Sequence, residues 1–328
     1  MRILVTGGTG FLGGALANRL LYDGHEVTVI GRNEARGKEL ALLGMNFIKA
    51  DLADGNAVIE ACQGQDYVVH CGALSAPWGK YVDFYKSNVL GTENVVRGCQ
   101  QHRIQRLTHV STPSLYMEYR DRYQIAEDDV LPSKAINTYA QTKRISESIV
   151  DTAYKQGLPV ITIRPRGIFG PGDTTIFPRL IRVNDSKGIP DFGKDVTVDI
   201  TYIENVVDAL VLCLHASERC FGEKYNITNG EPMQMQELLQ LLFAKLNYPL
   251  RLKKLPFFLA YSAASLAEFY ANIMPGAREP EITRYGVGVL YYSQTLDITA
   301  ARRELGFKPN ISISEGIERF ADWWRGER

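Results

Sequence analysis

A glycine-rich turn directly after the first apolar run constrains this 328-residue chain more than any other feature. Residues 2–6, Arg-Ile-Leu-Val-Thr, suit a buried parallel strand, and Gly7, Gly10 and Gly13 follow at the spacing Gly-x-x-Gly-x-x-Gly. Apolar residues then recur at helical spacing, and residues 26–30 form a second β-branched run. The order of strand, glycine turn, helix and strand predicts the first unit of a parallel α/β sheet.

This turn is chemically suited to the pyrophosphate of a dinucleotide. Glycines let the chain turn sharply and let a phosphate approach the backbone, while the N–H groups and dipole of the helix N-terminus stabilise negative charge. An ordinary strand-to-helix turn would use the same glycines, but the second strand at the expected distance favours the dinucleotide site. Gly7, Gly10 and Gly13, with Phe11 and Leu12, are therefore predicted to bind the cofactor.

The end of the second predicted strand bears on the choice between NAD and NADP. NAD sites usually place Asp or Glu there to bind the adenosine ribose, whereas this chain has Gly31 followed by Arg32. Arg32 can bind a 2′-phosphate, with Asn33 as a second donor. We therefore expect NADP(H) as the favoured cofactor, with NAD as the alternative; in the competing interpretation Arg32 only lies on the surface.

Strands and helices continue to alternate along the chain, as a doubly wound sheet requires. Runs at residues 46–50, 67–70 and 107–110 predict three more strands, whose carboxyl ends would meet at one edge of the sheet. Several residues directly after these strands are predicted to lie against the dinucleotide there: Asp51, Leu52, Cys71, Gly72 and Ala73. Asp51 would accept from the adenine amine, although a helix cap explains it equally well.

A tyrosine and a lysine four residues apart follow the fifth predicted strand. That strand delivers Ser111-Thr112 to the sheet edge, and Tyr139-x-x-x-Lys143 begins a helix, so the phenol and the ammonium share one helix face. Chance predicts about 0.7 such pairs in a chain with 17 tyrosines, so the pair is significant only because of its position after the fifth predicted strand. A neighbouring ammonium favours the phenolate, so we expect Lys143 to tune Tyr139 as a general acid/base and to bind the nicotinamide ribose, while Thr112 holds the substrate oxygen.

Taken together, these motifs resemble the extended short-chain dehydrogenase/reductase superfamily, also described as the NAD-dependent epimerase/dehydratase superfamily. The resemblance spans nearly the whole chain and includes residues 6–13, Asn88, the run Arg164 to Gly172 and a C-terminal signature at 296–309. It implies an NAD(P)-dependent enzyme with Tyr139, Lys143 and Thr112 as catalytic residues. It further implies that the cofactor is also contacted by Asn88, Pro165, Gly167 and Ile168.

Other segments are similar to one branch of that superfamily. Residues 201–209, Thr-Tyr-Ile-Glu-Asn-Val-Val-Asp-Ala, resemble the 3β-hydroxysteroid and sterol dehydrogenases, and residues 77–79 and 111–114 resemble bacterial 2-alkyl-3-oxoalkanoate reductases of that branch. Gly72 and Phe169 stand where many relatives have Ala and Tyr. The branch implies a ketone reductase acting on CH-OH groups, and family resemblance also implies a homodimer.

Composition excludes several other function classes. The 37 Lys and Arg balance the 37 Asp and Glu, so no net field favours nucleic acid or an anionic membrane surface as the main partner. Hydrophobic residues make up 45% and charged residues 23%, as in a folded soluble protein. The five cysteines form no Cys-x-x-Cys pair and no signal peptide is evident, so we expect reduced thiols, no metal site and a cytoplasmic location.

The length predicts one dinucleotide-binding domain with an interleaved second lobe. Residues 1–168 are expected to form an α/β Rossmann domain with a doubly wound parallel sheet, to which the chain returns near 198–227. Residues 169–328 are expected to form a smaller α/β substrate lobe. The apolar segment 255–274 is too short to cross a bilayer, and we expect it to line a pocket or cover its mouth; an interfacial helix and plain core are the alternatives.

The substrate is the least constrained part of the prediction. An apolar pocket suits an acyl or steroid-like ketone better than a sugar nucleotide, whose diphosphate needs several cations. Arg166, Arg179 and Arg182 could supply those cations or bind the carboxylate of a β-keto acid, and Ser114 and Phe177 complete the predicted substrate contacts.

The sequence thus predicts an NADP(H)-dependent enzyme that interconverts a ketone and a secondary alcohol on a hydrophobic 3-oxo, 3-hydroxy or steroid-like substrate. A sugar-nucleotide epimerase or dehydratase is the second interpretation. A nonenzymatic dinucleotide sensor is the third, and the intact Tyr139 and Lys143 weigh against it.

Overall fold

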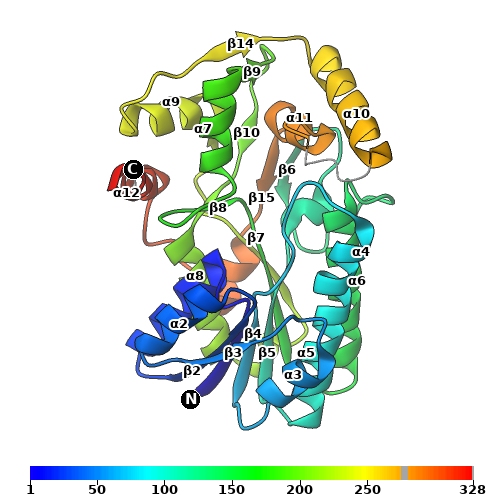
Figure 1. Ribbon diagram of the computed structural model, residues 1–328, viewed down its shortest axis with the longest axis vertical. Helices are drawn as coiled ribbons and strands as arrows, with labels where there is room; N and C mark the ends of the chain where they lie inside the picture. The colour runs from blue at the N-terminus through cyan, green and yellow to red at the C-terminus, as the bar shows by residue number, and fades with distance from the viewer. Residues whose placement is uncertain (275–279, 327–328) are drawn as a thin grey trace.

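A seven-stranded parallel sheet forms the centre of the protein in the computed structural model, which describes residues 1–274 and 280–326 (Figure 1). Its strands are ordered β12-β7-β5-β4-β1-β2-β3. Their bounds are β1 (Arg2–Thr6), β2 (Glu26–Gly31), β3 (Asn46–Lys49), β4 (Tyr67–His70), β5 (Arg106–Val110), β7 (Val160–Pro165) and β12 (Lys224–Ile227). The sheet confirms the predicted doubly wound α/β fold.

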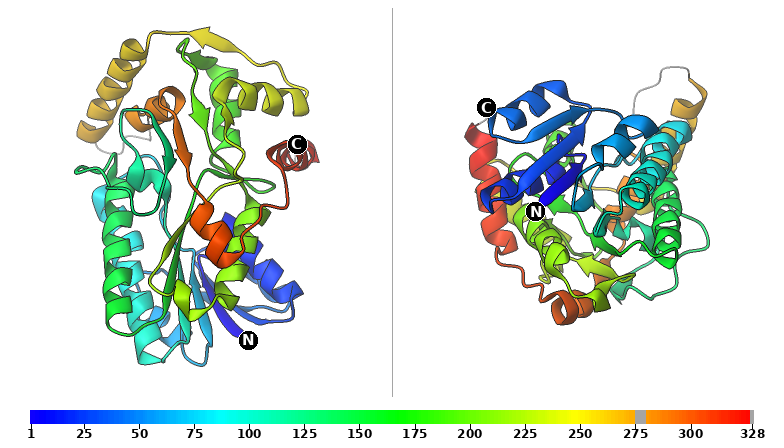
Figure 2. Two further views of the ribbon diagram at one scale, coloured as in Figure 1. Left: turned by 180° about the vertical axis from the view of Figure 1, so that it is seen from behind. Right: turned by 90° about the horizontal axis from the view of Figure 1, so that it is seen from below.

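Helices cover both faces of this sheet, as the view from below shows (Figure 2). One face carries α1 (Phe11–Tyr22), α2 (Glu34–Leu42) and α8 (Ile203–His215). The other carries α3 (Gly55–Ala61), α5 (Gly91–Gln101) and α6 (Thr138–Lys155). The short α4 (Tyr81–Phe84) and the π-helical η1 (Tyr85–Leu90) lead into α5.

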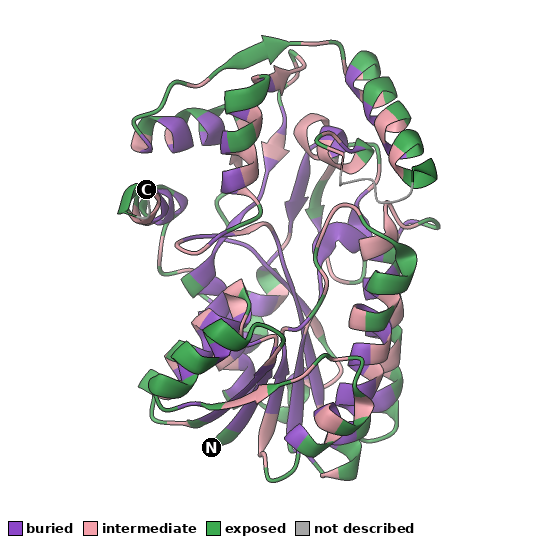
Figure 3. Ribbon diagram, viewed as in Figure 1, coloured by how far each residue is buried: buried purple, intermediate pink, exposed green. Residues whose placement is uncertain are grey.

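Most residues of the central strands are buried, because helices cover both faces of the sheet, and this favours apolar side chains (Figure 3). Along β1, Ile3 and Val5 pack into the core beneath α1 and α8, whereas Leu4 between them packs into a second core beneath α3 and α5. Successive side chains of a strand point to opposite faces, so one short run contributes to both cores.

A second lobe stands over the carboxyl edge, the edge of the main sheet at which its parallel strands end (Figure 1). It contains a four-stranded sheet in the order β13-β10-β15-β6 and two strand pairs, β11-β8 and β14-β9. These strands are β6 (Arg122–Ile125), β8 (Ile168–Phe169), β9 (Ile189–Asp191), β10 (Thr197–Val198), β11 (Thr201–Tyr202), β13 (Met233–Gln234), β14 (Leu252–Lys254) and β15 (Gln294–Leu296).

Five helices and three short turns complete the described chain. The helices are α7 (Phe177–Ser186), α9 (Met235–Lys245), α10 (Phe257–Ile273), α11 (Arg284–Tyr291) and α12 (Ile313–Gly326). The turns are η2 (Pro113–Tyr116), η3 (Glu218–Cys220) and the π-helical η4 (Ala301–Leu305). Within the described residues no helix combines the length and apolar character that crossing a bilayer requires.

Helix α10 exposes large apolar side chains and buries small ones. Its small residues Ala260 and Ala264 are buried against α11, whereas Leu266 and Phe269 are 69% and 66% exposed. The predicted apolar helix is therefore present, and several of its large apolar side chains, Leu266 and Phe269 among them, face outward.

Candidate active site

The glycine turn brings the ends of β1 and β4 into close contact. Gly7 has φ of +68°, a conformation that favours glycine, and a Cβ there would lie 2.6 Å from the Cα of Gly72. A Cβ at Gly13 would lie 2.3 Å from the Gly7 carbonyl oxygen, so α1 packs directly on the turn. Gly10 caps α1 and no side chain accepts a hydrogen bond at this cap. The first-turn N–H groups are thus left for an anion, and the residues fit a dinucleotide pyrophosphate.

The predicted adenosine end of this site holds an ion pair. Arg32 follows β2, Asp51 follows β3, and Arg32 Nη1 lies 3.6 Å from Asp51 Oδ2. Both side chains are largely exposed, at 66% and 47%. Asp51 Oδ1 also accepts from the N–H of Ala53, at 2.9 Å. The arginine predicted to bind a 2′-phosphate and the carboxylate predicted to bind adenine therefore lie side by side.

Asn88 supports the loop after β4 from behind. Its Oδ1 accepts from the N–H of Leu74 at 2.7 Å, and its Nδ2 donates to the Leu74 carbonyl and to Thr142 Oγ1. The Asn88 side chain is 1% exposed, so the structure places it as a brace between this loop and α6. Cys71 and Ala73 lie on the same loop, and Leu52 packs beneath Gly72.

Tyr139 is the centre of a cluster of hydroxyls at the carboxyl edge. The hydroxyls of Ser75 and Thr112 lie beside its phenol. Thr112 Oγ1 donates to Ser114 Oγ at 3.1 Å, and Ser114 Oγ lies 3.1 Å from the hydroxyl of Tyr285 on α11. We call Ser75, Thr112, Ser114, Tyr139 and Tyr285 the hydroxyl cluster. Burial raises the pKa of Tyr139, and the neighbouring hydroxyls of Ser75 and Thr112 act in the opposite direction.

Lys143 lies one helical turn beyond Tyr139 and is 1% exposed. Its Nζ donates to the Val110 carbonyl at 2.8 Å and lies 3.1 Å from Nε2 of His109. Burial lowers the pKa of Lys143 to about 8. The lysine and tyrosine share a helix face, as expected. In this structure the Lys143 ammonium is bound by the end of β5. That Lys143 lowers the pKa of the Tyr139 phenol remains a prediction for the cofactor-bound state.

A buried polar chain lies behind these residues. His70 Nδ1 lies 2.7 Å from Thr6 Oγ1, and its Nε2 lies 3.0 Å from Thr92 Oγ1. Thr92 in turn lies 2.6 Å from Ser146 Oγ on α6. These hydrogen-bonded side chains connect β1, β4, α5 and α6 beneath the carboxyl edge, so α6 is fixed relative to the glycine turn.

Two arginines at the end of β7 have contrasting surroundings. Arg164 makes two hydrogen bonds with Glu147 of α6, at 2.9 and 2.6 Å, and its other donors reach Tyr116 and the Glu127 carbonyl. Arg166 is also buried, at 7% exposure, without such a carboxylate partner in the described chain. Pro165 is the last residue of β7, Gly167, with φ of +52°, lies in the turn that follows, and Ile168 is the first residue of β8.

The remaining substrate candidates lie in different places. Phe177 is fully buried in the main core, where its ring packs on Phe169 and Phe320, and it presents no surface to a ligand. Arg179 is partly exposed on α7. Ser114 is buried in the hydroxyl cluster.

Sequence reasoning missed two members of the hydroxyl cluster. Ser75 follows β4 in a loop with no motif, and Tyr285 is one of 17 tyrosines and lies in the second lobe. The position of Ser75 after a strand end was a usable signal, whereas only the tertiary fold brings Tyr285 to this edge.

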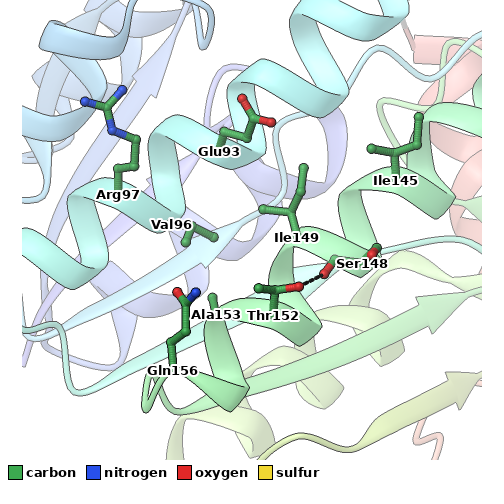
Figure 4. A pocket seen from close by; sticks show the side chains of 9 residues that line it. All are labelled: Glu93, Val96, Arg97, Ile145, Ser148, Ile149, Thr152, Ala153 and Gln156. Atoms are coloured by element: carbon green, nitrogen blue, oxygen red, sulfur yellow. Dashed lines mark hydrogen bonds between the residues drawn. The ribbon is translucent and has the colours of Figure 1, made fainter.

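An open groove lies apart from this site, between α5 and α6 (Figure 4). Val96 of α5 and Ile145, Ile149 and Ala153 of α6 supply its apolar wall. None of the groove's lining residues belongs to the hydroxyl cluster or to the glycine turn. The groove is therefore not part of the candidate active site.

Comparison with known proteins adds three findings. Residues 3–228 match the model of the NAD dependent epimerase/dehydratase family. The chain is similar to the 2-alkyl-3-oxoalkanoate reductase of Stenotrophomonas maltophilia, with 37% identity over 97% of this chain and 98% of that protein. It is also similar to the sterol-4-alpha-carboxylate 3-dehydrogenase, decarboxylating, of Mus musculus, with 29% identity over 96% of this chain and 88% of that protein.

Solved structures show the same fold. UDP-glucuronic acid 4-epimerase from Bacillus cereus, in complex with NAD, superposes with a TM-score of 0.78 and covers 99% of both chains, at 23% sequence identity. At this identity the likeness concerns the fold alone, and it agrees with the order of the seven parallel strands.

Proposed function

The chain belongs to the NAD-dependent epimerase/dehydratase family, and we propose that within it the protein is an NAD(P)-dependent oxidoreductase that interconverts a ketone and a secondary alcohol on a hydrophobic substrate. Membership confirms the resemblance expected from the motifs, including the branch of 3-oxoalkanoate reductases and sterol dehydrogenases. The observation that carries the proposal is the hydroxyl cluster beside the glycine turn, because it offers proton donors where a carbonyl oxygen would meet the cofactor edge.

The proposed roles follow from the contacts of each residue. Tyr139 gives a proton to the carbonyl oxygen in reduction and takes it back in oxidation, while Thr112 and Ser75 hold that oxygen by hydrogen bonds. Lys143, buried beneath, would stabilise the phenolate and bind the ribose once released from the Val110 carbonyl. The bound dinucleotide supplies or accepts the hydride.

We further propose that NADP(H) is the preferred cofactor. Family membership establishes an NAD-type dinucleotide, and the preference for the 2′-phosphate rests on Arg32, which is exposed at the end of β2 where NAD sites usually carry an acid. The homodimer and the cytoplasmic location remain predictions.

The alternative activity within the same family is epimerisation or dehydration of a sugar nucleotide. Those reactions return the hydride to the substrate, so they produce no net change in the cofactor. The two sequence relatives described above are a reductase and a dehydrogenase by name, whereas the likeness to the epimerase lies in the fold.

The test is the rate of NADPH oxidation with 3-oxoacyl, steroid and aldehyde substrates, and with UDP- and GDP-sugars as controls. We expect net turnover with a hydrophobic ketone, and a loss of about 10²- to 10⁴-fold in kcat for Tyr139→Phe with unchanged NADPH binding, since proton transfer contributes that much. Tyr154→Phe, on the exposed part of α6, is the matched control. Full turnover in Tyr139→Phe would refute the assignment, and sugar conversion without net cofactor change would favour the epimerase.

A further inference from the structure

His109 is a fully buried histidine with one polar partner in the described chain. It lies near the end of β5 and is 0% exposed. Its Nε2 lies 3.1 Å from Nζ of Lys143, whereas its Nδ1 has no hydrogen-bond partner within residues 1–274 and 280–326. Buried polar atoms in proteins are nearly always hydrogen-bonded. The unpaired Nδ1 therefore indicates that the ring is oriented for Lys143 rather than for the core.

His70, the neighbour of His109 across the sheet, shows the usual arrangement of a buried histidine. The two residues lie opposite each other on β4 and β5, with ring centroids 5.5 Å apart. The two ring nitrogens of His70 lie 2.7 and 3.0 Å from the hydroxyls of Thr6 and Thr92. Hydroxyls of the core thus satisfy the His70 ring at both nitrogens. The contrast assigns His70 to the structure and leaves His109 available to the lysine.

The contact with Lys143 defines the protonation of the His109 ring. An ammonium has three N–H donors and no acceptor, so Nε2 of His109 has to accept, and a neutral ring that does so carries its proton on Nδ1. Burial is the main cause that lowers the pKa of His109 well below its ordinary value. Electrostatic repulsion from Lys143, His70 and Lys224 lowers it further. The ring is therefore neutral near pH 7, as an acceptor has to be.

The ammonium of Lys143 has few acceptors. Two of its three donors are used, one by the Val110 carbonyl at 2.8 Å and one by His109. Because burial lowers the pKa of Lys143 to about 8, the ammonium is close to losing its charge near neutral pH. A hydrogen bond to the charged form opposes that loss. Removal of an acceptor should therefore lower the pKa of Lys143 further.

The other titratable groups around Lys143 do not replace His109. Glu147 lies one turn further along α6, and Arg164 binds both of its carboxylate oxygens, at 2.9 and 2.6 Å. Cys71, after β4, is an uncharged thiol, because burial raises its pKa to about 12. Among the described residues, His109 is thus the side chain that accepts from this ammonium.

We propose that His109 is a positioning residue for the reaction, because its neutral imidazole binds the Lys143 ammonium one helical turn from Tyr139 and keeps it charged. The inference rests on the proposed function, in which Lys143 stabilises the Tyr139 phenolate and binds the ribose. That function requires release of Lys143 from the Val110 carbonyl, after which His109 would be the remaining acceptor that the described residues offer.

The first measurement is the titration of Lys143 in the protein without cofactor or substrate. Protein labelled with ¹³C at the lysine ε-carbon is titrated by NMR, and Lys143→Met identifies the signal. We expect His109→Leu, which has a similar volume and no acceptor, to lower the pKa of Lys143 by at least about one unit, the worth of a hydrogen bond to a charged group. His109→Gln offers a carbonyl oxygen in place of Nε2 and should keep the pKa of Lys143 within about 0.5 units of wild type.

His102→Leu is the matched control. His102 is the C-cap residue of α5 and precedes β5 at the opposite edge of the sheet. Its replacement should leave the titration of Lys143 unchanged.

The second measurement is the pH dependence of oxidation. Wild type and the three histidine variants are given saturating NADP⁺ with methyl 3-hydroxydecanoate, and kcat/KM is measured across pH. Oxidation requires the Tyr139 phenolate, so kcat/KM rises with pH, and a charged Lys143 moves that rise to lower pH. In His109→Leu we expect the rise to move upward by about one pH unit, with about tenfold lower kcat/KM at neutral pH. In His109→Gln and His102→Leu it should stay in place, whereas purely structural damage would lower kcat/KM equally at every pH.

Three results would overturn the inference. They are an unchanged pKa of Lys143 in His109→Leu, an equal fall of that pKa in His109→Gln, and a pH profile of His109→Leu that does not shift. If His109→Leu does not fold, His109→Phe replaces it with the same expectations. No turnover by wild type of this ester, nor of any ketone or alcohol tested, would instead refute the proposed function, and the NMR titration would still decide whether His109 keeps Lys143 charged.

Discussion

At the scale of single residues, the structure separates side chains that hold the site together from those left free to meet ligands. Asn88, His70 and Arg164 are buried with their hydrogen bonds made within the protein. Arg32 and Arg166 have the opposite character, the first exposed beside Asp51 and the second buried without a carboxylate partner. Since all five residues are polar, the sequence alone could not show which of them stabilise the site and which are left to bind a ligand.

Cofactor preference is the residue-scale prediction that follows from Arg32. Replacing Arg32 by Asp removes the cation proposed to face the 2′-phosphate and places a second carboxylate near Asp51. We expect the ratio of kcat/KM for NADPH over NADH to fall by about 10- to 100-fold, the usual worth of a hydrogen bond to a charged group. Steady-state kinetics with both cofactors measure this ratio. Arg36→Asp on α2, which breaks only a pair with Glu39, is the control, and a ratio unchanged in Arg32→Asp would disprove the role.

At the scale of elements, sequence reasoning succeeded where periodicity is local. The strands at 2–6, 26–30 and 67–70 lie within a residue of their predicted bounds, and a helix follows the glycine turn as predicted. The strands of the second lobe could not be predicted, because they are two to four residues long and pair with strands far away in the sequence, as β10 does with β13 and β15. A two-residue strand has no measurable alternation, so only the tertiary fold defines it.

Helix α10 gives a prediction at this scale because several of its large apolar side chains are exposed whereas its small residues Ala260 and Ala264 are buried. Leu266 and Phe269 point outward, so Leu266→Ser and Phe269→Ser should each change the free energy of unfolding by no more than about 0.5 kcal/mol. Ala264 is fully buried against α11, so Ala264→Leu should cost about 1–3 kcal/mol through overpacking. Urea unfolding of the three variants tests the pattern, and a large loss in the outward variants would show that this face is covered.

At the scale of the whole molecule, the candidate active site lies where the two lobes meet. The first lobe supplies Thr112 after β5 and Tyr139 near the start of α6, and the second lobe supplies Tyr285. The net charge of the whole chain, which is zero, gives no sign of charged groups at this site. Arg166 and Lys143 are nevertheless buried cations close to it. The two lobes therefore have to fold together for the site to form.

Stability toward acid is a whole-molecule property that follows from the buried bases. His70 and His109 lie opposite each other on β4 and β5, with ring centroids 5.5 Å apart. Burial lowers the pKa of His70 to about 3 and the pKa of His109 well below its ordinary value. Burial raises the pKa of Asp199 to about 6, which acts in the opposite direction.

Below about pH 6.5 the unfolded chain protonates both histidines while the folded chain does not, so the unfolded state binds more protons and is favoured as pH falls. Each histidine contributes a slope of up to about 1.4 kcal/mol per pH unit, and Asp199 offsets at most one of the two, because the folded state binds its proton. We therefore expect urea unfolding at several pH values between 7 and 5.5 to show stability falling with acidity. His70→Gln should reduce the slope of unfolding free energy against pH by up to about 1.4 kcal/mol per pH unit, the contribution of one proton. His215→Gln, at an exposed position, should leave that slope unchanged. An identical slope in His70→Gln and wild type would mean that the acid sensitivity comes from other groups.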